Sequence, residues 1–301
     1  MQNPEYSKSK IKKIIILGHT GFIGSRLSSF FEKSTKDIKV IGKSFPEIDL
    51  TKYDDVLSLK KYFDMDSVVV MCSALKKEHG DNIDNFFKNI NMVANLCRLI
   101  ETNPVRKFIY FSSAAVYGEE VHNLKISEDT LISPTSYYSL AKYCSEVLLK
   151  NSIKNGSGGR LTIIRPPVIY GPGDQPCYGP SGFAKAAIDK GTITLWGDGT
   201  EKREFVFVDD IVDIVNRLVF SNFEGVLNIA TGNSYSFIEV LEILSSLLEH
   251  KINIEAKERT KQKIDHGFDN SKLIKLFPNF SFTPLEQGIK KTMESIKCSI
   301  E

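Results

Sequence analysis

The stretch Ile14-Ile-Ile-Leu-Gly18-His-Thr-Gly21-Phe-Ile-Gly24 decides the fold, because an apolar run passes through a glycine turn into a segment with helical spacing. A dinucleotide pyrophosphate needs backbone amides at a helix N-terminus and no side chain in its way. Gly18 permits the tight turn, Gly21 permits close approach of the phosphates, and Gly24 lets the helix pack on the strand. The stretch therefore predicts a dinucleotide-binding turn. An ordinary strand–helix turn is the alternative reading.

Strand-like and helix-like segments alternate through the first half of the chain. The expected strands are residues 14–17, 39–41, 67–71, 107–111 and 161–164, and the expected helices are 22–33, 56–62, 83–100 and 136–152. This alternation indicates a parallel sheet that helices cover on both faces. We therefore predict an α/β fold of the Rossmann type, a doubly wound parallel sheet whose dinucleotide-binding core covers residues 10–165.

The pattern changes after Arg165. Residues 166–204 are rich in proline and glycine and predict only short elements. Strands are expected at 205–208 and 226–229, returning to the core or flanking it, and a helix at 237–249 precedes a mixed tail. Residues 166–301 are interpreted mainly as a smaller mixed substrate-binding lobe at the carboxyl edge of the sheet, where open α/β sheets bind ligands.

Composition narrows the classes of partner. Lysine plus arginine number 39 against 37 aspartate plus glutamate, and no basic block is long enough to track a nucleic-acid backbone. No apolar run has the length of a signal peptide or a membrane span, so a cytoplasmic protein without membrane partners is expected. The cysteines lack a C-x-x-C pair and are read as reduced thiols with no metal or disulfide role; they are Cys72, Cys97, Cys144, Cys177 and Cys298.

Tyr138 and Lys142 are four residues apart and so share one helix face. A free tyrosine titrates near 10, and a neighbouring lysine together with the positive nicotinamide ring would lower that pKa. The phenol could then exchange a proton while hydride moves at the adjacent carbon. Tyr6 and Lys10 have the same spacing without that context, so their match is read as accidental.

Ser113 follows the fourth expected strand, where its hydroxyl is well placed to hydrogen-bond a reacting oxygen. Strand alternation turns Ser112 the other way, and a loop-capping role for Ser113 is the alternative. The choice of cofactor stays open between NAD and NADP. The second strand ends without a carboxylate, so Lys43 either meets the 2′-phosphate of NADP or is a solvated surface lysine, and Asp49, before Leu50, could reach the adenine side.

Five ordered blocks resemble the extended short-chain dehydrogenase/reductase family, in its nucleotide-sugar epimerase and dehydratase branch, which includes UDP-sugar 4-epimerases and 4-keto-sugar reductases. The resemblance runs from Ile14 to Lys290, and the blocks are Gly18–Gly24, Ser112–Gly118, Tyr138–Lys142, Arg165–Gly173 and Gly197–Asp210. It implies a catalytic triad of Ser113, Tyr138 and Lys142. It also implies that the cofactor contacts Gly18, Thr20, Gly21, Phe22, Ile23, Gly24, Lys43, Asp49, Leu50, Ser73, Ala74, Lys76, Asn89, Tyr138 and Lys142, with Asn89 in a structural or cofactor-side role.

On the substrate side, Arg203 and Arg259 match two arginines that clamp a diphosphate, for which two planar guanidiniums are suited. Ser113 would contact the sugar. Trp196 matches an apolar residue against the nucleobase, and a place in the lobe's core is the alternative. The family also implies a homodimer formed by the helices at 83–100 and 136–152.

Departures from the family's pattern narrow the expected reaction. Ala114 and Ala115 stand where dehydratases of this branch have Asp-Glu, and Ala115 stands where GDP-fucose synthase has a cysteine acid, so a 4,6-dehydratase and ring epimerisation of that kind are not expected. Val168 replaces the usual asparagine, which puts one substrate contact in doubt. There remain 4-epimerisation and oxidation or reduction at C4 of a nucleotide sugar. A non-catalytic nucleotide-binding protein and an enzyme for a small ketone or alcohol are the other hypotheses.

Overall fold

The computed structural model describes residues 11–156, 159–175, 179–189, 191–248, 250–259 and 262–298. The chain divides into two compact units. The first consists of Met1–Gly118, Ile132–Arg165 and Val212–Leu227, and the second of Glu119–Leu131, Pro166–Ile211 and Asn228–Glu301. The Tyr6–Lys10 pair and Cys177 lie outside the described residues.

The first unit is built on a six-stranded sheet. Its strands are β1 (Lys13–Leu17), β2 (Lys39–Lys43), β3 (Ser67–Met71), β4 (Lys107–Phe111), β6 (Arg160–Arg165) and β10 (Gly225–Asn228), in the order β10-β6-β4-β3-β1-β2. All neighbours from β6 to β2 pair in parallel. The strand order reverses at β1, and the glycine turn follows that strand. The predicted α/β fold of the Rossmann type is therefore confirmed.

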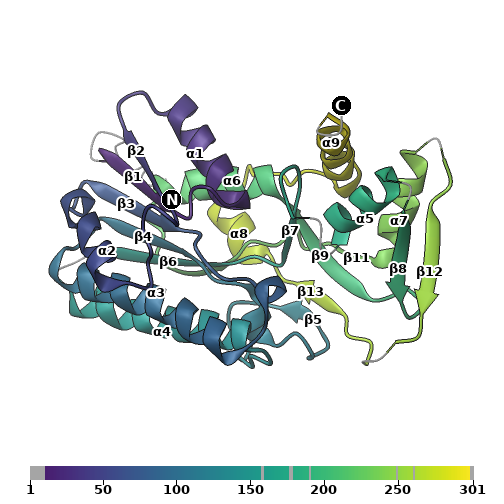
Figure 1. The fold of residues 1–301 in the computed structure, drawn as a ribbon, viewed down its shortest axis with the longest axis horizontal. Helices are drawn as coiled ribbons and strands as arrows, with labels where there is room; N and C mark the ends of the chain where they lie inside the picture. The colour runs from purple at the N-terminus through teal and green to yellow at the C-terminus, as the bar shows by residue number, and fades with distance from the viewer. Residues whose placement is uncertain are drawn as a thin grey trace. The chain divides into compact units, whose positions relative to one another are not determined.

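Helices cover both faces of this sheet. They are α1 (Phe22–Ser34), α2 (Tyr53–Leu57), α3 (Ile83–Thr102) and α4 (Tyr137–Asn155). Figure 1 shows α3 and α4 side by side below the strands and α1 above them. Along β1, Ile15 and Leu17 pack with Leu96 and Leu149 from α3 and α4. The intervening Ile14 is also fully buried, so both faces of the strand are apolar.

The described residues of the second unit form three small sheets. The first has the order β11-β9-β7, from Ser234–Ser236, Lys202–Phe207 and Val168–Tyr170; the others pair β8 (Thr192–Trp196) with β12 (Asn253–Lys257) and β5 (Asn123–Ile126) with β13 (His266–Phe268). Its helices are α5 (Gly179–Ile188), α7 (Phe237–Ser246), α8 (Ser271–Leu276) and α9 (Leu285–Cys298). Phe205, Phe237 and Ile289 belong to its apolar core.

Several expected elements differ from the observed ones. The strand expected at 205–208 ends at Phe207, and Val208 begins α6 (Val208–Val219) instead. The reason is that Val208, Ile211 and Val215 recur at helical spacing and are all buried. β9 pairs with β7 and β11, whereas β10 joins the six-stranded sheet. The expected helix at 56–62 is divided between α2 and a 3-10 helix at Ser58–Tyr62, and the mixed tail contains α9.

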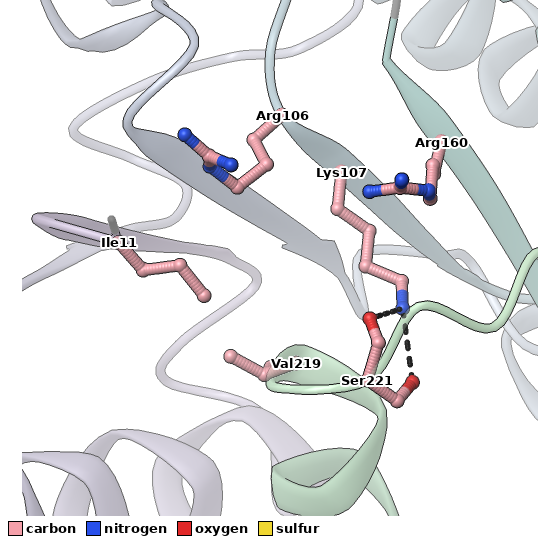
Figure 2. Close-up of a pocket in the computed structure, with 6 residues that line it drawn as sticks. All are labelled: Ile11, Arg106, Lys107, Arg160, Val219 and Ser221. Carbon is pink, nitrogen blue, oxygen red and sulfur yellow. Dashed lines mark hydrogen bonds between the residues drawn. The ribbon is translucent and has the colours of Figure 1, made fainter. Parts of the chain in front are cut away.

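The amino ends of β4 and β6 carry a pocket with a structural lysine. Figure 2 shows its lining, which is Ile11, Arg106, Lys107, Arg160, Val219 and Ser221. The Lys107 ammonium donates to the carbonyls of Leu218 at 2.6 Å and Ser221 at 3.1 Å, just where α6 ends. Burial lowers the pKa of Lys107 to about 7. The lysine therefore satisfies helix-end carbonyls, at the edge of the sheet opposite the glycine turn.

None of the described helices is both long and apolar enough to cross a membrane. Within the described ranges, no three His, Cys, Asp or Glu side chains are grouped so that they could hold a metal ion.

Candidate active site

The glycine turn is packed so closely that side chains are excluded from two of its positions. Gly18 has φ of +90°, and a Cβ there would lie 2.8 Å from the backbone nitrogen of Ser73. A Cβ on Gly24 would lie 2.0 Å from the Gly18 carbonyl oxygen. The Gly18 N–H donates to the Lys43 carbonyl at 2.7 Å, which ties the turn to the end of β2. Both glycines are therefore needed for the turn itself.

Gly21 differs, because a Cβ there would meet only the Gly18 carbonyl oxygen, at 3.4 Å. Gly21 is also the N-cap of α1, where no side chain accepts a cap hydrogen bond and the first turn has no acidic residue. The amino end of α1, which includes Phe22 and Ile23, thus presents backbone amides without a carboxylate of its own. This arrangement is suited to an anion such as a pyrophosphate.

The end of β2 carries the residues considered for cofactor selection. Lys43 forms an ion pair with Glu47. The Thr20 amide donates to Ser44 Oγ at 3.1 Å, and that hydroxyl contacts His19 Nδ1 at 2.9 Å. The Lys43 charge is therefore compensated by a carboxylate four residues later.

Asp49 closes a local turn. Its Oδ1 accepts hydrogen bonds from the Thr51 hydroxyl at 2.6 Å and the Thr51 amide at 3.0 Å. These bonds to Thr51 hold the pKa of Asp49 below its usual range. Leu50, next in the chain, is buried. The Asp49 carboxylate is thus engaged by the hydroxyl and the amide of Thr51.

Asn89 of α3 fastens the loop that follows β3. Its Oδ1 accepts from the Leu75 amide at 2.8 Å and its Nδ2 donates to the Leu75 carbonyl at 3.0 Å, and the residue is 7% exposed. The half-buried Ser73, Ala74 and Lys76 flank Leu75 in this loop. The geometry supports the structural part of the role considered for Asn89, because a side-chain amide that satisfies both backbone groups fixes the loop's path.

The lysine and tyrosine of the expected triad meet near the end of β4. Lys142 is 5% exposed, and its Nζ donates to the Phe111 carbonyl at 2.6 Å. The same nitrogen lies 5.7 Å from the centroid of the Tyr138 ring. Burial lowers the pKa of Lys142 to about 8. The amide of Tyr138 donates to Asp81 at 2.9 Å, which fixes the start of α4.

Ser113 lies two residues after Phe111. Its Oγ accepts a hydrogen bond from the Ala115 amide at 3.2 Å and so caps the 3-10 helix Ala114–Tyr117. The capping role considered as the alternative is therefore present. A hydroxyl has one proton and two lone pairs, however, so the cap leaves Ser113 able to donate to a ligand.

A buried ion-pair network, which the sequence reasoning missed, supports this part of the chain. Arg165 donates to both carboxylate oxygens of Glu146, at 2.8 and 2.5 Å, and to the Tyr117 hydroxyl at 2.9 Å. Ser112 Oγ donates to the same carboxylate at 2.5 Å. Glu146 follows Lys142 by four residues, and that spacing on one helix face was the available signal.

In the second unit, three charged side chains form a compact cluster. Arg203 bonds to one oxygen of the Glu201 carboxylate and Arg259 bonds to the other. Arg203 also donates to the carbonyls of Lys202, at 2.8 Å, and of Ile264. The two expected arginines are thus brought together, and the carboxylate that joins them was not expected.

Trp196, at the end of β8, is 54% exposed, so it is not part of the apolar core of its unit. The Lys257 ammonium lies 5.9 Å from the centroid of its ring. Val168 begins β7 and pairs with Phe205 of β9. An exposed indole with a lysine ammonium near its ring presents an aromatic face and positive charge together, which suits a nucleotide.

Comparisons with known proteins give a consistent result. The sequence model of the NAD dependent epimerase/dehydratase family matches residues 14–230. The GDP-6-deoxy-D-talose 4-dehydrogenase of Aggregatibacter actinomycetemcomitans is 28% identical over 250 residues, which cover 82% of this chain and 83% of that protein. The GDP-L-colitose synthase of Yersinia pseudotuberculosis is 23% identical, over 94% of this chain and 97% of its own.

Among solved structures, the UDP-glucose 4-epimerase of Thermotoga maritima, with UDP-glucose, superimposes with a TM-score of 0.84. The two sequences are 22% identical, and the match covers 96% of this chain and 100% of that one. This likeness concerns the fold.

Proposed function

The chain belongs to the NAD-dependent epimerase/dehydratase family, and on that premise we propose that it transfers hydride at C4 of a nucleotide-diphosphate sugar, with Tyr138 as the acid/base. The observation that carries this proposal is the Lys142 ammonium, bonded to the Phe111 carbonyl and 5.7 Å from the Tyr138 ring. With a pKa of about 8, Lys142 is mostly protonated at neutral pH. Its charge therefore favours the phenolate form of Tyr138.

The glycine turn fits the pyrophosphate of a dinucleotide, because a Cβ on Gly21 would meet only the Gly18 carbonyl oxygen and the start of α1 has no acidic residue. When bound, the nicotinamide ring supplies or accepts the hydride. We propose NAD over NADP, since Glu47 compensates the charge of Lys43 and its carboxylate would repel a 2′-phosphate. Binding of NADP as tight as that of NAD, or tighter, would contradict this choice.

The chain's own groups handle the proton. The Tyr138 phenolate accepts the proton of the sugar hydroxyl when hydride leaves the carbon, and the phenol so formed returns the proton in the reverse direction. Ser113 donates its free proton to the reacting oxygen and so favours one orientation of the sugar. Ala114 and Ala115 carry no group that exchanges protons, and we therefore propose that no water is eliminated from the sugar.

Arg203, Arg259 and Trp196 support a nucleoside diphosphate as the part of the substrate that is recognised. Two guanidiniums offer planar donor pairs to phosphate oxygens, and an exposed indole can stack on a base. A small neutral ketone or alcohol has no phosphate oxygens for the two guanidiniums to bind. Arg203→Ala should accordingly weaken binding of a diphosphate-bearing substrate and leave that of a neutral one unchanged.

The reaction is either 4-epimerisation, in which the cofactor stays bound, or net oxidation or reduction at C4, in which it is exchanged. The likeness to a GDP-sugar 4-dehydrogenase supports the second alternative. Denaturing the purified protein and identifying the released dinucleotide separates them, because an epimerase retains NAD through purification and a dehydrogenase or reductase releases it.

Tyr138→Phe tests the proposal directly. Without the phenolic proton, turnover of the nucleotide sugar should fall by about 10²- to 10⁴-fold, whereas binding of NAD should be unchanged. Turnover is followed by nicotinamide absorbance or by product analysis. Tyr137→Phe, at the adjacent exposed position, is the matched control and should keep full activity. Full turnover in Tyr138→Phe would refute the assignment.

We also propose a homodimer formed by the outer surface of α3 and α4. This surface carries exposed apolar side chains, which are Ile83, Phe87, Tyr137, Leu140 and Val147. Burying such a patch against a second copy removes it from water. Sedimentation should give twice the chain mass of 33.8 kDa, and Phe87→Glu should give the monomer. A monomeric wild-type protein at micromolar concentration would contradict the proposal.

A further inference from the structure

Glu201 occupies the two arginines in the way that a bridging phosphate would. Its Oε1 bonds to Arg203 Nη2 and its Oε2 bonds to Arg259 Nη1. All three side chains are partly exposed, between 15 and 20%. A carboxylate and a phosphate both present paired oxygens to a guanidinium, so the same donors serve either anion.

The remaining donors of these arginines have other surroundings. Arg203 Nη1 donates to backbone carbonyls, and Arg259 Nη2 lies 3.6 Å from Asp198 Oδ1 without forming a hydrogen bond to it. The Arg259 guanidinium also lies against Gly197, where a Cβ would be 2.6 Å from its Nε. Both arginines are thus held in place by the chain. The N–H groups that a ligand could take over are those that now donate to Glu201, on Arg203 Nη2 and Arg259 Nη1.

Charge makes Glu201 more than a spacer. The two guanidiniums carry two positive charges, of which the Glu201 carboxylate cancels one and Asp198 reduces the remainder. A diphosphate that approaches Arg203 and Arg259 therefore meets a carboxylate already bonded to both. Like charges at this distance repel, and the effect is large at partly buried sites.

We propose that Glu201 is an internal competitor for the diphosphate-binding arginines, which the substrate must displace from Arg203 and Arg259 and which returns when the product leaves. The inference rests on the proposed function, since it takes the nucleoside diphosphate as the ligand of this cluster. Glu201 keeps the two like-charged arginines together in the free protein. It also lowers their affinity for the nucleotide, which favours release of the product.

The origin of the arrangement is partly local. Glu201 directly precedes β9 and Arg203 is its second residue, and residues two apart in an extended segment face the same side. Arg259 follows β12 and lies 58 residues further along the chain. The bridge therefore joins the segment before β9 to the segment after β12, the strand that pairs with β8.

Glu201→Gln tests the inference, because glutamine keeps one carbonyl acceptor for an arginine and removes the negative charge. The dissociation constants of UDP and GDP, measured by isothermal titration calorimetry, should fall by about tenfold or more, equivalent to at least about 1.4 kcal/mol. With the nucleotide sugar as substrate, KM should fall while kcat stays constant or decreases through slower product release. Asp189→Asn removes a negative charge at an exposed position near the end of α5 and should change none of these constants.

The direction of the change separates competition from simple support. If Glu201 only held the arginines in position, the glutamine variant would bind UDP and GDP equally or more weakly, and either result would overturn the inference. If neither the wild type nor Glu201→Gln bound a nucleoside diphosphate while both bound NAD, the proposed substrate class would fail and this inference with it. Equal binding by both would overturn this inference alone.

Discussion

Two glutamate–arginine clusters in this chain contain the same kinds of charged group but differ in solvent exposure. In the first unit, Glu146 and Arg165 are 0 and 3% exposed, and every oxygen of the carboxylate has a donor. In the second unit, Glu201 joins Arg203 and Arg259 where water still reaches all three. A buried pair that satisfies itself fixes the position of its helix and strands. A partly exposed pair can be opened by a competing anion, because water compensates the displaced group.

The difference follows from what each carboxylate would lose when its arginine leaves. Glu146 would remain in the interior with only the Ser112 hydroxyl, whereas Glu201 could turn to solvent. Exposure therefore decides whether the same ion pair acts as scaffold or as binding site. The network around Glu146 lies beside Lys142, on the same helix face, and so supports the site without taking part in its chemistry.

Breaking the buried pair should have the largest effect on stability. Arg165→Met leaves the Glu146 carboxylate without its cation, and removal of one partner of a buried pair costs about 3–5 kcal/mol. The free energy of unfolding from urea titrations measures the loss. The matched change in the other cluster, Arg203→Met, should lower the free energy of unfolding by about 1 kcal/mol or less. The reason is that the Glu201 carboxylate still has Arg259 as its partner and still contacts water.

Equal losses in Arg165→Met and Arg203→Met would contradict the comparison, since they would mean that exposure does not distinguish the two clusters. The variant of the first unit should be corrected for any shift in the denaturant slope, which reports a change in the surface exposed on unfolding.

A third carboxylate, that of Glu204, extends the comparison of buried and exposed carboxylates and should have a smaller effect on stability. Glu204 is buried, forms no ion pair with a described residue and accepts hydrogen bonds from Thr231, Gly232 and Phe268. Burial raises the pKa of Glu204 to about 7. The folded protein thus binds this proton more tightly than the unfolded chain does. The protonated Glu204 side chain therefore adds its full contribution to the free energy of unfolding below pH 4.5. That contribution is lost as the pH rises to about 7.

Glu204→Gln removes this titration. Relative to the variant, the wild type should lose roughly 1–3 kcal/mol between pH 5 and pH 8, measured by urea unfolding at several pH values. Glu239, whose pKa is lowered by hydrogen bonds to Ser236, provides a control. The difference in free energy of unfolding between wild type and Glu239→Gln should stay constant over the same pH range. A difference between wild type and Glu204→Gln that does not vary with pH would show that the three hydrogen bonds outweigh burial.

Most of the first unit could be predicted from local pattern. The expected strands at 67–71 and 107–111 coincide with β3 and β4, and the expected helices at 22–33 and 83–100 with α1 and α3 to within two residues. Each of these elements carries its own apolar period, and the glycines mark the turn between β1 and α1. Pattern was less informative in the second unit, where β7, β11 and β13 have three residues each. Strands of that length show no period, and their pairing partners lie far away in the chain.

The sequence by itself determined the glycine turn, the alternation of strands and helices, and the Tyr138–Lys142 spacing, because each of these depends on residues within a few positions of one another. Tertiary structure alone decided that Lys142 bonds to the end of β4, that Arg165 shares Glu146 with Ser112, and that Glu201 joins Arg203 to Arg259. These contacts join residues 19 to 58 positions apart or bring together more than two side chains. Their energies depend on burial and on distance in space, and neither quantity is encoded in the order of neighbouring residues.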